Sequence, residues 1–527
     1  MTMTSRFRTL YWSILLLPAV AGAQAAGQPN FLILLTDDQR WDTLGSYREG
    51  NPIKTPHIDR LANEGVRFEN GFVTTPICVA SRASILTGRY ASNARVHQFQ
   101  TLMPADVFER TYNMLLEEAG YFTGQLGKYG VKITQEQQGR HSFWDAQEGQ
   151  GPKFREYQGR TLHDSEWLTV RTEDFLDALP EGRPFALQVN YKAPHGTSCP
   201  APEDEGALAD VYFERHPKDT DEMAERVPAF VRTSFLEVCY RQEFNDGVDD
   251  HNPFVREYFE KIMSVERSVG HIVALLEERG LADNTVIIFL SDHGVHFGEK
   301  QLYGKWTPFD ASLRVPFIVY DPRPGAARGA VRDQMVLNID IAPTLMDLAG
   351  LPVPEYMDGR SMHPLIEEAS QTADLEWRDH FFFEHFTSPA RVKYIPRNEG
   401  IRTATGKYVH WIDPQCDEEE FYDLVRDPEE VDNLIGDPEM APRVARLRGI
   451  FGEWRTSNPR NYNYDVYEGH RPQSLAPEID WERFAASRPE EFEQIREQVE
   501  RLGVTWEQAM YDWEIRYKIS SHAGYWY

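Results

Sequence analysis

The stretch Phe31–Thr36, FLILLT, followed directly by Asp37 and Asp38, decides the fold class of this chain. An uncharged, almost wholly apolar run of this length is typical of a parallel β-strand that is buried on both faces. Open α/β sheets bind their ligands at the carboxyl ends of such strands, which is where the two acids follow. The stretch therefore predicts a buried parallel sheet with an acidic pair at its ligand-binding edge.

A second stretch repeats this design later in the chain. The run Thr285–Leu290, TVIIFL, leads into Ser291, Asp292, His293 and Gly294. Three carboxylates and one imidazole at the ends of two strands suit one divalent cation, and the oxygen-rich donor set favours Ca²⁺ over zinc. Each acidic pair alone is more typical of a turn or a helix cap, but repetition at equivalent strand ends disfavours that alternative.

Helix and strand patterns alternate as far as about residue 365. Helical patterns cover 55–65, 112–120, 167–179 and 254–279, and further strand patterns cover 185–191 and 315–320. The alternation predicts an α/β fold in which a large, mainly parallel sheet is sandwiched by helices. Two long polar segments, 135–166 and 196–250, have no such pattern, and we expect them to be substrate-facing loops.

The pattern changes after residue 375. Short strand patterns and a helical pattern at 444–454 predict a smaller α+β subdomain with a short antiparallel sheet. The last part of the chain is rich in Tyr, Trp and acids and has one helical pattern, at 489–502. The divisions we expect are a signal peptide at 1–25, the α/β domain at 26–370, the C-terminal subdomain at 371–457 and an aromatic-rich extension at 458–527.

The first residues have the pattern of a secretory signal peptide. Arg6 and Arg8 precede the apolar segment Leu10–Val20, and Ala23-Gln24-Ala25 provides a small-residue cleavage site. The apolar segment is too short to span a bilayer stably, and no later apolar run reaches about 18 residues. We therefore expect a periplasmic or secreted protein with no stable membrane insertion.

The charge balance limits the classes of partner. The chain has 55 Lys and Arg against 83 Asp and Glu, a formal net charge of −28. This excludes general nucleic-acid binding through a basic surface, and an anionic substrate needs a local basic pocket. Solubility explains most of the acidity. Cys199 and Cys239 are able to pair in an oxidising compartment, but the sequence leaves this open.

The segment Pro76–Gly88, PICVASRASILTG, predicts a helix with Cys78 at its start and a glycine at its end. Cys78 and Arg82 are four residues apart, so their side chains lie on one helix face. Unpaired N–H groups and the helix dipole favour negative charge at the helix start. A reactive thiol, a cation and an anion-attracting helix end thus converge, although the segment alone also fits a half-buried cysteine beside a surface arginine.

The order of these motifs resembles that of the formylglycine-dependent sulfatases of the alkaline phosphatase-like superfamily. The motifs are DD at 37–38, C-x-A-S-R-A-S-x-L-T-G at 78–88, GK at 127–128, PH at 194–195, SDHG at 291–294, GK at 304–305 and a VPF strand at 315–317. The resemblance covers about residues 30–365, and EEFYDLVRDPEEVDNL at 419–434 resembles the family's small C-terminal subdomain. The cysteine motif is highly specific, and the other motifs gain specificity from their order.

The resemblance implies that a formylglycine-generating or equivalent maturation enzyme oxidises Cys78 to formylglycine, whose aldehyde hydrates to a diol. One hydroxyl of the diol would attack sulfur and release the alcohol, and the second would expel sulfate. The implied ligands of the metal, Ca²⁺, are Asp37, Asp38, residue 78, Asp292 and His293. His293 stands where many members of the family have asparagine.

The resemblance also implies roles for four further residues. Arg82 would hold the diol, Lys128 and Lys305 would bind the sulfate, and His195 would protonate or position the leaving oxygen. Elementary chemistry agrees with these roles, because a sulfate ester stays anionic at physiological pH and attack on it by an oxygen nucleophile needs neutralising cations.

Two positions depart from the family's pattern. Ala80 stands where the cysteine motif usually has proline. Gly130 stands where the G-K-x-H motif has a histidine that assists the formylglycine, so either another group replaces it or activity is weakened. His97 and His296 are the candidates for replacing it or for binding substrate, and a purely structural role is the alternative for each.

We expect the substrate to be a sulfated polysaccharide or oligosaccharide, because aromatic-rich loops beside a cationic pocket suit sugar rings that carry sulfate. The alternatives are a small aryl or alkyl sulfate, a phosphodiester or phosphonate ester, and a weakly active sulfated-glycan-binding protein, which only Gly130 suggests. Sulfate release separates an enzyme from a binding protein, and a phosphoester panel separates the two kinds of hydrolase.

Overall fold

We describe a computed structural model of the chain, which covers residues 27–458 apart from 100, 233, 235, 237–239, 241–250, 369–374, 387–394 and 414–415, together with Glu493 and Arg496. The expected signal peptide at 1–25 lies outside the described residues, as do Cys239 and almost all of the C-terminal extension with its helical pattern at 489–502. Cys199 has a free thiol.

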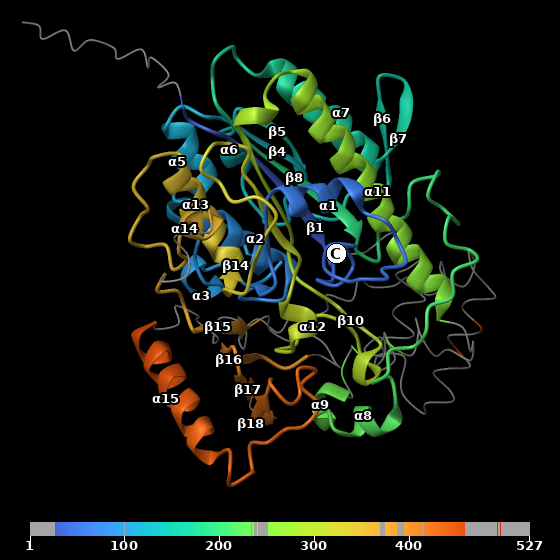
Figure 1. Cartoon of the computed structure of the whole chain (residues 1–527), viewed down its shortest axis with the longest axis vertical. Helices are drawn as coiled ribbons and strands as arrows, with labels where there is room; N and C mark the ends of the chain where they lie inside the picture. The colour runs from blue at the N-terminus through green and yellow to red at the C-terminus, as the bar shows by residue number, and fades with distance from the viewer. Residues whose placement is uncertain are drawn as a thin grey trace, which may run out of the picture.

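An eight-stranded mixed sheet forms the centre of the molecule (Figure 1). In sheet order its strands are β13 (Ala330–Arg332), β2 (Val66–Phe68), β12 (Phe317–Tyr320), β9 (Thr285–Ser291), β1 (Asn30–Asp37), β8 (Phe185–Pro194), β4 (Phe122–Lys128) and β5 (Phe143–Gln147). The strands β9, β1, β8, β4 and β5 are parallel to one another, whereas β12 runs antiparallel to both of its neighbours. The predicted large, mainly parallel sheet is confirmed, and every residue of β1 is buried.

Helices cover both faces of this sheet, because successive residues of a strand point to opposite sides. Leu32 and Leu34 of β1 pack in one core, and Phe31, Ile33 and Leu35 pack in the other. The first core includes residues of α1 (Pro56–Glu64), α7 (Asp164–Ala178) and α11 (Asn252–Glu278). The second includes residues of α2 (Cys78–Thr87), α5 (Tyr112–Glu118), α13 (Ile341–Leu348) and α14 (His363–Ile366).

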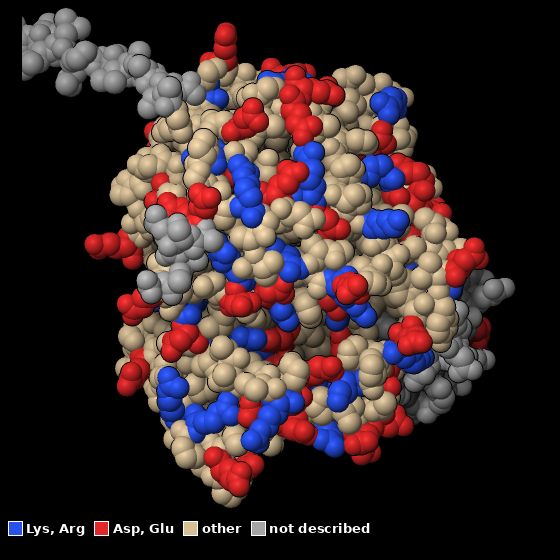
Figure 2. Space-filling model, in the orientation of Figure 1, with Lys and Arg blue, Asp and Glu red and all other residues tan. Residues whose placement is uncertain are grey.

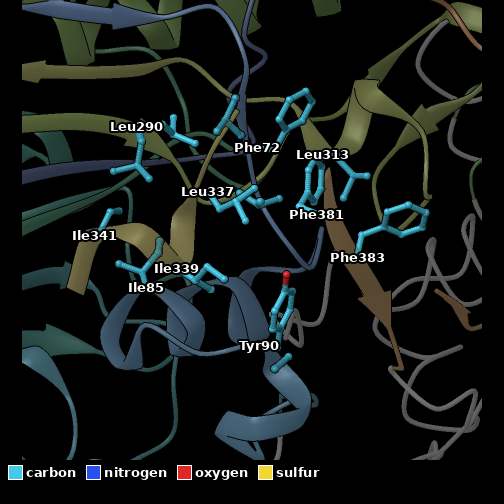
Figure 3. Packing of buried hydrophobic residues seen from close by; sticks show 14 of the residues in the cluster. Phe72, Ile85, Tyr90, Leu290, Leu313, Leu337, Ile339, Ile341, Phe381 and Phe383 are labelled. Atoms are coloured by element: carbon cyan, nitrogen blue, oxygen red, sulfur yellow. The ribbon is translucent and has the colours of Figure 1, made fainter. Parts of the chain in front are cut away.

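A second, antiparallel sheet lies at the lower end of the molecule in Figure 1. Its strands are β15 (His380–His385), β16 (Asn398–Thr403), β17 (Gly406–Asp413) and β18 (Cys416–Asp423), with α15 (Ala441–Ser457) beside them. This C-terminal sheet shares one apolar core with the α/β layers: Phe381 and Phe383 of β15 lie near Phe72 and Leu313 (Figure 3). The predicted short antiparallel sheet is confirmed, and packing joins it closely to the larger sheet.

The segment 135–166, which we expected to be a loop, contains regular structure instead. It forms α6 (Gln135–Gln138), the edge strand β5 and the hairpin of β6 (Phe154–Tyr157) and β7 (Arg160–His163). The residues of β5 are only half-buried, so this edge strand needs no apolar run and its sequence gives little sign of it. The other expected loop, from residue 196 onward, includes the short helices α8 (Asp221–Glu225) and α9 (Ala229–Arg232).

Short elements complete the described fold. They are α3 (Ala91–Ala94), α4 (Ala105–Phe108), η2 (Ala282–Asn284), η3 (Glu299–Gln301), α12 (Asp310–Leu313), η4 (Asn338–Asp340) and the strand pairs β3–β14 (Gly71–Phe72 with Val336–Leu337) and β10–β11 (His296–Phe297 with Tyr303–Gly304). Acidic and basic side chains are interspersed over the face shown in Figure 2. Within the described part of the chain, no helix has both the length and the apolar composition needed to cross a membrane.

Candidate active site

The ends of four parallel strands place the predicted site residues at one edge of the large sheet. Asp37 is the last residue of β1 and Lys128 the last of β4, while Asp292 follows β9 and His195 follows β8. The backbone N–H of Asp292 donates to the carbonyl of Thr36 at 3.0 Å, which holds the two acidic strand ends together. Because these strands are parallel, four side chains that are far apart in the sequence lie in one cluster.

Cys78 lies at the centre of this cluster. It is the first residue of α2, a helix whose residues are all buried and which ends at Gly88 with φ of 67°. Its Sγ is 3.2 Å from Nε2 of His293, 3.3 Å from Nζ of Lys305 and 3.6 Å from Oδ1 of Asp37. The helix start thus brings the thiol against carboxylate, imidazole and ammonium groups at once.

Four of the predicted metal ligands form a compact donor set. One ligand atom each from Asp37, Cys78, Asp292 and His293 lies within 4.8 Å of all the others, and all four residues are buried. Nδ1 of His293 lies 2.9 Å from the carbonyl of Gly294, so Nδ1 carries a proton, and Nε2 offers a lone pair to a cation when it is not itself protonated. Two carboxylates, an imidazole lone pair and residue 78 fit a divalent cation.

Asp38 and His293 show that negative charge is concentrated in this donor set. Asp38, with φ of 66°, has Oδ1 3.3 Å from Nε2 of His293 and forms a second group of potential ligands with Asp37 and His195. Burial opposes protonation of His293, but the adjacent Asp292 carboxylate raises the pKa of the imidazole to about 9. The cluster therefore attracts positive charge.

Two lysines pair with the acidic strand ends. Lys128 pairs with Asp37, and Nζ of Lys305 lies 2.6 Å from Oδ1 of Asp38. Burial acts to raise the pKa of Asp37, yet Lys128 and His195 lower it well below its usual value. Burial likewise acts to lower the pKa of Lys305, but Asp38 raises it above its usual value. Asp37 and Lys305 consequently stay charged at neutral pH.

Arg82 is fixed by three acceptors and keeps one nitrogen for another partner. Its Nε donates to Oδ2 of Asp292 at 2.8 Å, and its Nη1 donates to the carbonyl of Lys128 and to Oδ1 of Asn190 at 3.3 Å. Its Nη2 is buried and has no hydrogen-bond partner. An orphaned guanidinium nitrogen beside a reactive group is what an anionic or diol ligand would satisfy.

Gly130 packs directly on Arg82. Its φ is 75°, and a β-carbon at this position would clash with Cδ of Arg82 and lie 3.1 Å from Nε. The space that a side chain at position 130 would need is therefore filled by the arginine. A histidine does not fit here unless Arg82 moves.

His195 presents one proton to the same site. Its Nδ1 accepts the backbone N–H of Thr197 at 3.1 Å, so the neutral ring carries its proton on Nε2, which lies 3.8 Å from Oδ2 of Asp38. Burial lowers the pKa of His195 to about 3, so the ring is neutral at neutral pH. A neutral imidazole in this tautomer is a hydrogen-bond donor through Nε2.

The structure places the other two predicted histidines differently. His296 is 1% exposed and its Nε2 lies 2.8 Å from Oγ1 of Thr307. His97 follows α3 and is half-buried, and burial lowers its pKa to about 4. Neither belongs to the two groups of potential metal ligands formed by the described residues.

Sequence reasoning missed two residues that orient the site. Asn190 of β8 accepts from Arg82, and its Nδ2 donates to the carbonyl of Leu126 at 2.9 Å. Thr197 sets the tautomer of His195. The sequence could have indicated Asn190, because a polar side chain near the end of a buried strand needs a hydrogen-bond partner. It could not have indicated Thr197, because that contact arises from the geometry of the turn.

The chain matches known families and individual proteins along most of its length. A family model described as Sulfatase matches residues 29–351, and one described as N-sulphoglucosamine sulphohydrolase, C-terminal, matches residues 298–456. The chain is 27% identical over 511 residues to the N-acetylglucosamine-6-O-sulfatase of Bacteroides thetaiotaomicron, covering 84% of this chain and 90% of the relative. It is 30% identical over 475 residues to the arylsulfatase of Clostridium perfringens, covering 80% and 93%.

Solved structures share the fold of this chain. A protein solved in complex with its substrate D-glucosamine-2-N,6-O-disulfate has a TM-score of 0.72 and 26% identity, covering 82% of this chain and 99% of that one. A phosphonate monoester hydrolase from Silicibacter pomeroyi has a TM-score of 0.68 and 24% identity, covering 82% and 96%. At that identity the second likeness shows the fold alone.

Proposed function

Because the chain belongs to the sulfatase family and is a sulfuric ester hydrolase with the alkaline phosphatase-like fold, we propose that it removes sulfate from a sulfated polysaccharide or oligosaccharide. The reacting group is formylglycine made from Cys78 by a maturation enzyme. The observation that carries this proposal is the position of Cys78, whose Sγ lies within 3.6 Å of Asp37, His293 and Lys305.

Two groups supply chemistry that the unmodified chain lacks. Hydrated formylglycine supplies one hydroxyl to attack sulfur and a second whose oxygen expels sulfate. A divalent cation, for which we propose Ca²⁺, supplies Lewis-acid polarisation of the sulfate oxygens and lowers the cost of forming an oxygen nucleophile. Asp37, Asp38, Asp292, His293 and residue 78 would hold it.

The chain's own cations neutralise the charge of the sulfate. Lys128 pairs with Asp37 and Lys305 pairs with Asp38, and each lysine would donate to a sulfate oxygen. The unpaired Nη2 of Arg82 would donate to a hydroxyl of the diol and keep it oriented. Donors fixed before the substrate arrives cost no reorganisation during the reaction, which is why such sites stabilise developing charge well.

His195 acts on the leaving oxygen. Its Nε2–H points toward the carboxylate cluster, and its Nδ1 is already bonded to Thr197. The ring would therefore hydrogen-bond the ester oxygen and stabilise the negative charge that develops on it as the S–O bond breaks. Such help matters most for a sugar hydroxyl, which is a poor leaving group.

The names of similar proteins support a sulfated sugar as the substrate. One curated relative is an N-acetylglucosamine-6-O-sulfatase, and one solved neighbour holds a glucosamine disulfate as its substrate. The phosphonate hydrolase neighbour favours the phosphoester alternative only weakly, because its likeness extends to the fold alone. We also propose that residues 1–25 direct the chain to the periplasm or the exterior, where such polymers are found.

A sulfate-release assay tests the proposal. Protein co-expressed with a formylglycine-generating enzyme is incubated with defined sulfated glycans, including glucosamine with N- and 6-O-sulfate, and with aryl sulfates, phosphodiesters and phosphonate esters. We expect the highest kcat/KM on a sulfated glycan, and no turnover by Cys78→Ala. Activity on aryl sulfates with none on any glycan would contradict the carbohydrate substrate, and preference for a phosphoester would contradict the sulfatase assignment.

A further inference from the structure

The loop that follows Lys305 is anchored to the C-terminal sheet from its first residue. The ring of Trp306 stacks on His385, the last residue of β15, with ring centres 5.7 Å apart and an angle of 27° between the planes. The carbonyl of Trp306 accepts Nδ2–H of Asn398 in β16 at 3.3 Å. Two strands of the smaller sheet therefore hold the residue next to the lysine.

The far end of this loop is fixed by a buried cluster of charges. Arg402 of β16 donates through Nη2 to Oδ2 of Asp310 at 2.9 Å, and Lys407 of β17 donates to Oδ1 of Asp310 at 2.6 Å. Lys407 also donates to the carbonyl of Pro308 at 2.8 Å and pairs with Glu430. Every residue from 306 to 310 thus lies between two tethered ends.

These charges are buried and mutually dependent. Lys407 is 0% and Arg402 is 7% exposed. The backbone N–H of Asp310 donates to Oε2 of Glu430 at 2.7 Å, and Lys300 donates to the carbonyl of Glu430 at 2.6 Å. Removing one member of such a set leaves an uncompensated charge in a low-dielectric interior, so the set favours a single arrangement of the loop.

The backbone beside Lys305 needs this support. Trp306 has φ of 78°, in the left-handed region that residues with a β-carbon rarely adopt. Such a conformation persists only when the surrounding structure enforces it. From the α/β side, Oγ1 of Thr307 contacts His296 and Ser312, each at 2.8 Å, which gives His296 a positioning function.

We propose that the C-terminal sheet is a working part of the active site, because Lys407, Asp310 and Arg402 position Lys305 against the sulfate. Lys407 and Asp310 are positioning residues that act through Lys305 and touch neither substrate nor metal. The inference rests on the proposed function in one respect, the binding of sulfate by Lys305. The placement of the loop by the C-terminal sheet is independent of it.

A double-mutant cycle tests the inference in the full chain. Lys407→Met, Lys305→Ala and the double variant are compared for kcat/KM on 4-nitrophenyl sulfate. If Lys407 acts through Lys305, Lys407→Met lowers kcat/KM by about 10-fold alone but by less than about 2-fold in the Lys305→Ala background, since coupled residues are not additive. Losses that multiply would overturn the inference. Arg267→Met on α11, which breaks a partly buried ion pair with Asp204, is the matched control, and its effect should multiply.

Hydrogen exchange gives a readout that needs no activity. Amides of the peptide 303–309 should exchange at least about 10-fold faster in Lys407→Met, and in the isosteric Asp310→Asn if the first variant folds poorly, while amides of β1 stay protected. Unchanged exchange in this peptide would overturn the inference even in an inactive protein. An inactive wild type with faster exchange in the variants would instead count against the proposed function alone.

Discussion

Arg82 and Gly130 are in direct contact, and the arginine occupies the space into which a side chain at position 130 would extend. This contact explains why the motif at residues 127–130 reads GKYG without leaving a cavity. The guanidinium donates to Asp292, Asn190 and the carbonyl of Lys128, and its Nη2 has no hydrogen-bond partner. The glycine is thus part of the arrangement that holds Arg82 in place.

Gly130→Ala should therefore lower kcat/KM by more than about 10-fold, because a β-carbon at φ of 75° is strained and displaces Arg82. The control is Gly280→Ala: its φ is 66°, and a β-carbon there would meet nothing within 4 Å. It should cost about 1 kcal/mol of stability and leave kcat/KM unchanged. Steady-state kinetics and thermal unfolding of both variants check this, and equal kinetic losses would refute it.

Residue 78 should be formylglycine in the active enzyme. Mass spectrometry of the peptide that contains residues 76–88, from protein made with a maturation enzyme, should detect an aldehyde. The aldehyde fraction should scale with specific activity across preparations of different maturation. Fully active protein with an unmodified thiol would contradict the assignment.

Asp292→Asn should lose both metal and activity. The carboxylate lies in the donor set with Asp37, Cys78 and His293 and also holds Nε of Arg82, so the change removes charge from two contacts. Metal content measured by mass spectrometry should fall to background, with kcat/KM lowered by more than about 100-fold.

Asp204→Asn is the control for this metal prediction, because Asp204 is a buried carboxylate that pairs with Arg267 and contacts Ser264 away from the site. It should keep the full metal content. A full complement of metal in Asp292→Asn would show that the ligand assignment is wrong.

His195→Ala should harm hydrolysis of sugar sulfates far more than hydrolysis of aryl sulfates. A sugar alkoxide leaves poorly unless a hydrogen bond stabilises its charge, whereas a phenolate leaves readily, so we expect a loss of about 10²–10⁴-fold on the former and about 10-fold or less on the latter. Parallel kcat/KM measurements on one sulfated glycan and 4-nitrophenyl sulfate check this. Equal losses on both would remove the leaving-group role and leave the sulfatase assignment intact.

Asn190→Leu should lower kcat/KM by about 10-fold through Arg82. Oδ1 of Asn190 accepts from Arg82, and its Nδ2 donates to the carbonyl of Leu126, so the amide has one orientation. Leucine removes every hydrogen bond of this buried amide, including those with Gln188 and Gln125, and each partner left unpaired costs about 1–3 kcal/mol of stability. Asn190→Asp keeps an acceptor for Arg82 and should recover most of the activity. Failure of Asp to recover more than Leu would argue against this positioning role.

The local patterns of the chain were enough to predict much of the fold. The uncharged run before Asp37 was sufficient to predict a strand buried on both faces, because only an apolar segment tolerates contact with two helix layers. The edge strand β5 escaped prediction for the opposite reason: a half-buried strand at a sheet edge has no strict apolar requirement. Hydrophobic patterns in a sequence indicate which segments are buried, so an element that is little buried has only a weak pattern.

The sequence by itself determined the kinds of chemical group available: two acidic strand ends, a cysteine at a helix start, and lysines and a histidine after further strands. Their order along the chain was enough to identify the family. Only the tertiary structure decided that Gly130 packs on Arg82, that Thr197 sets the tautomer of His195, and that the C-terminal sheet holds the loop after Lys305. These are contacts between groups brought together by sheet register and turn geometry, and spacing along a chain does not encode distances across a fold.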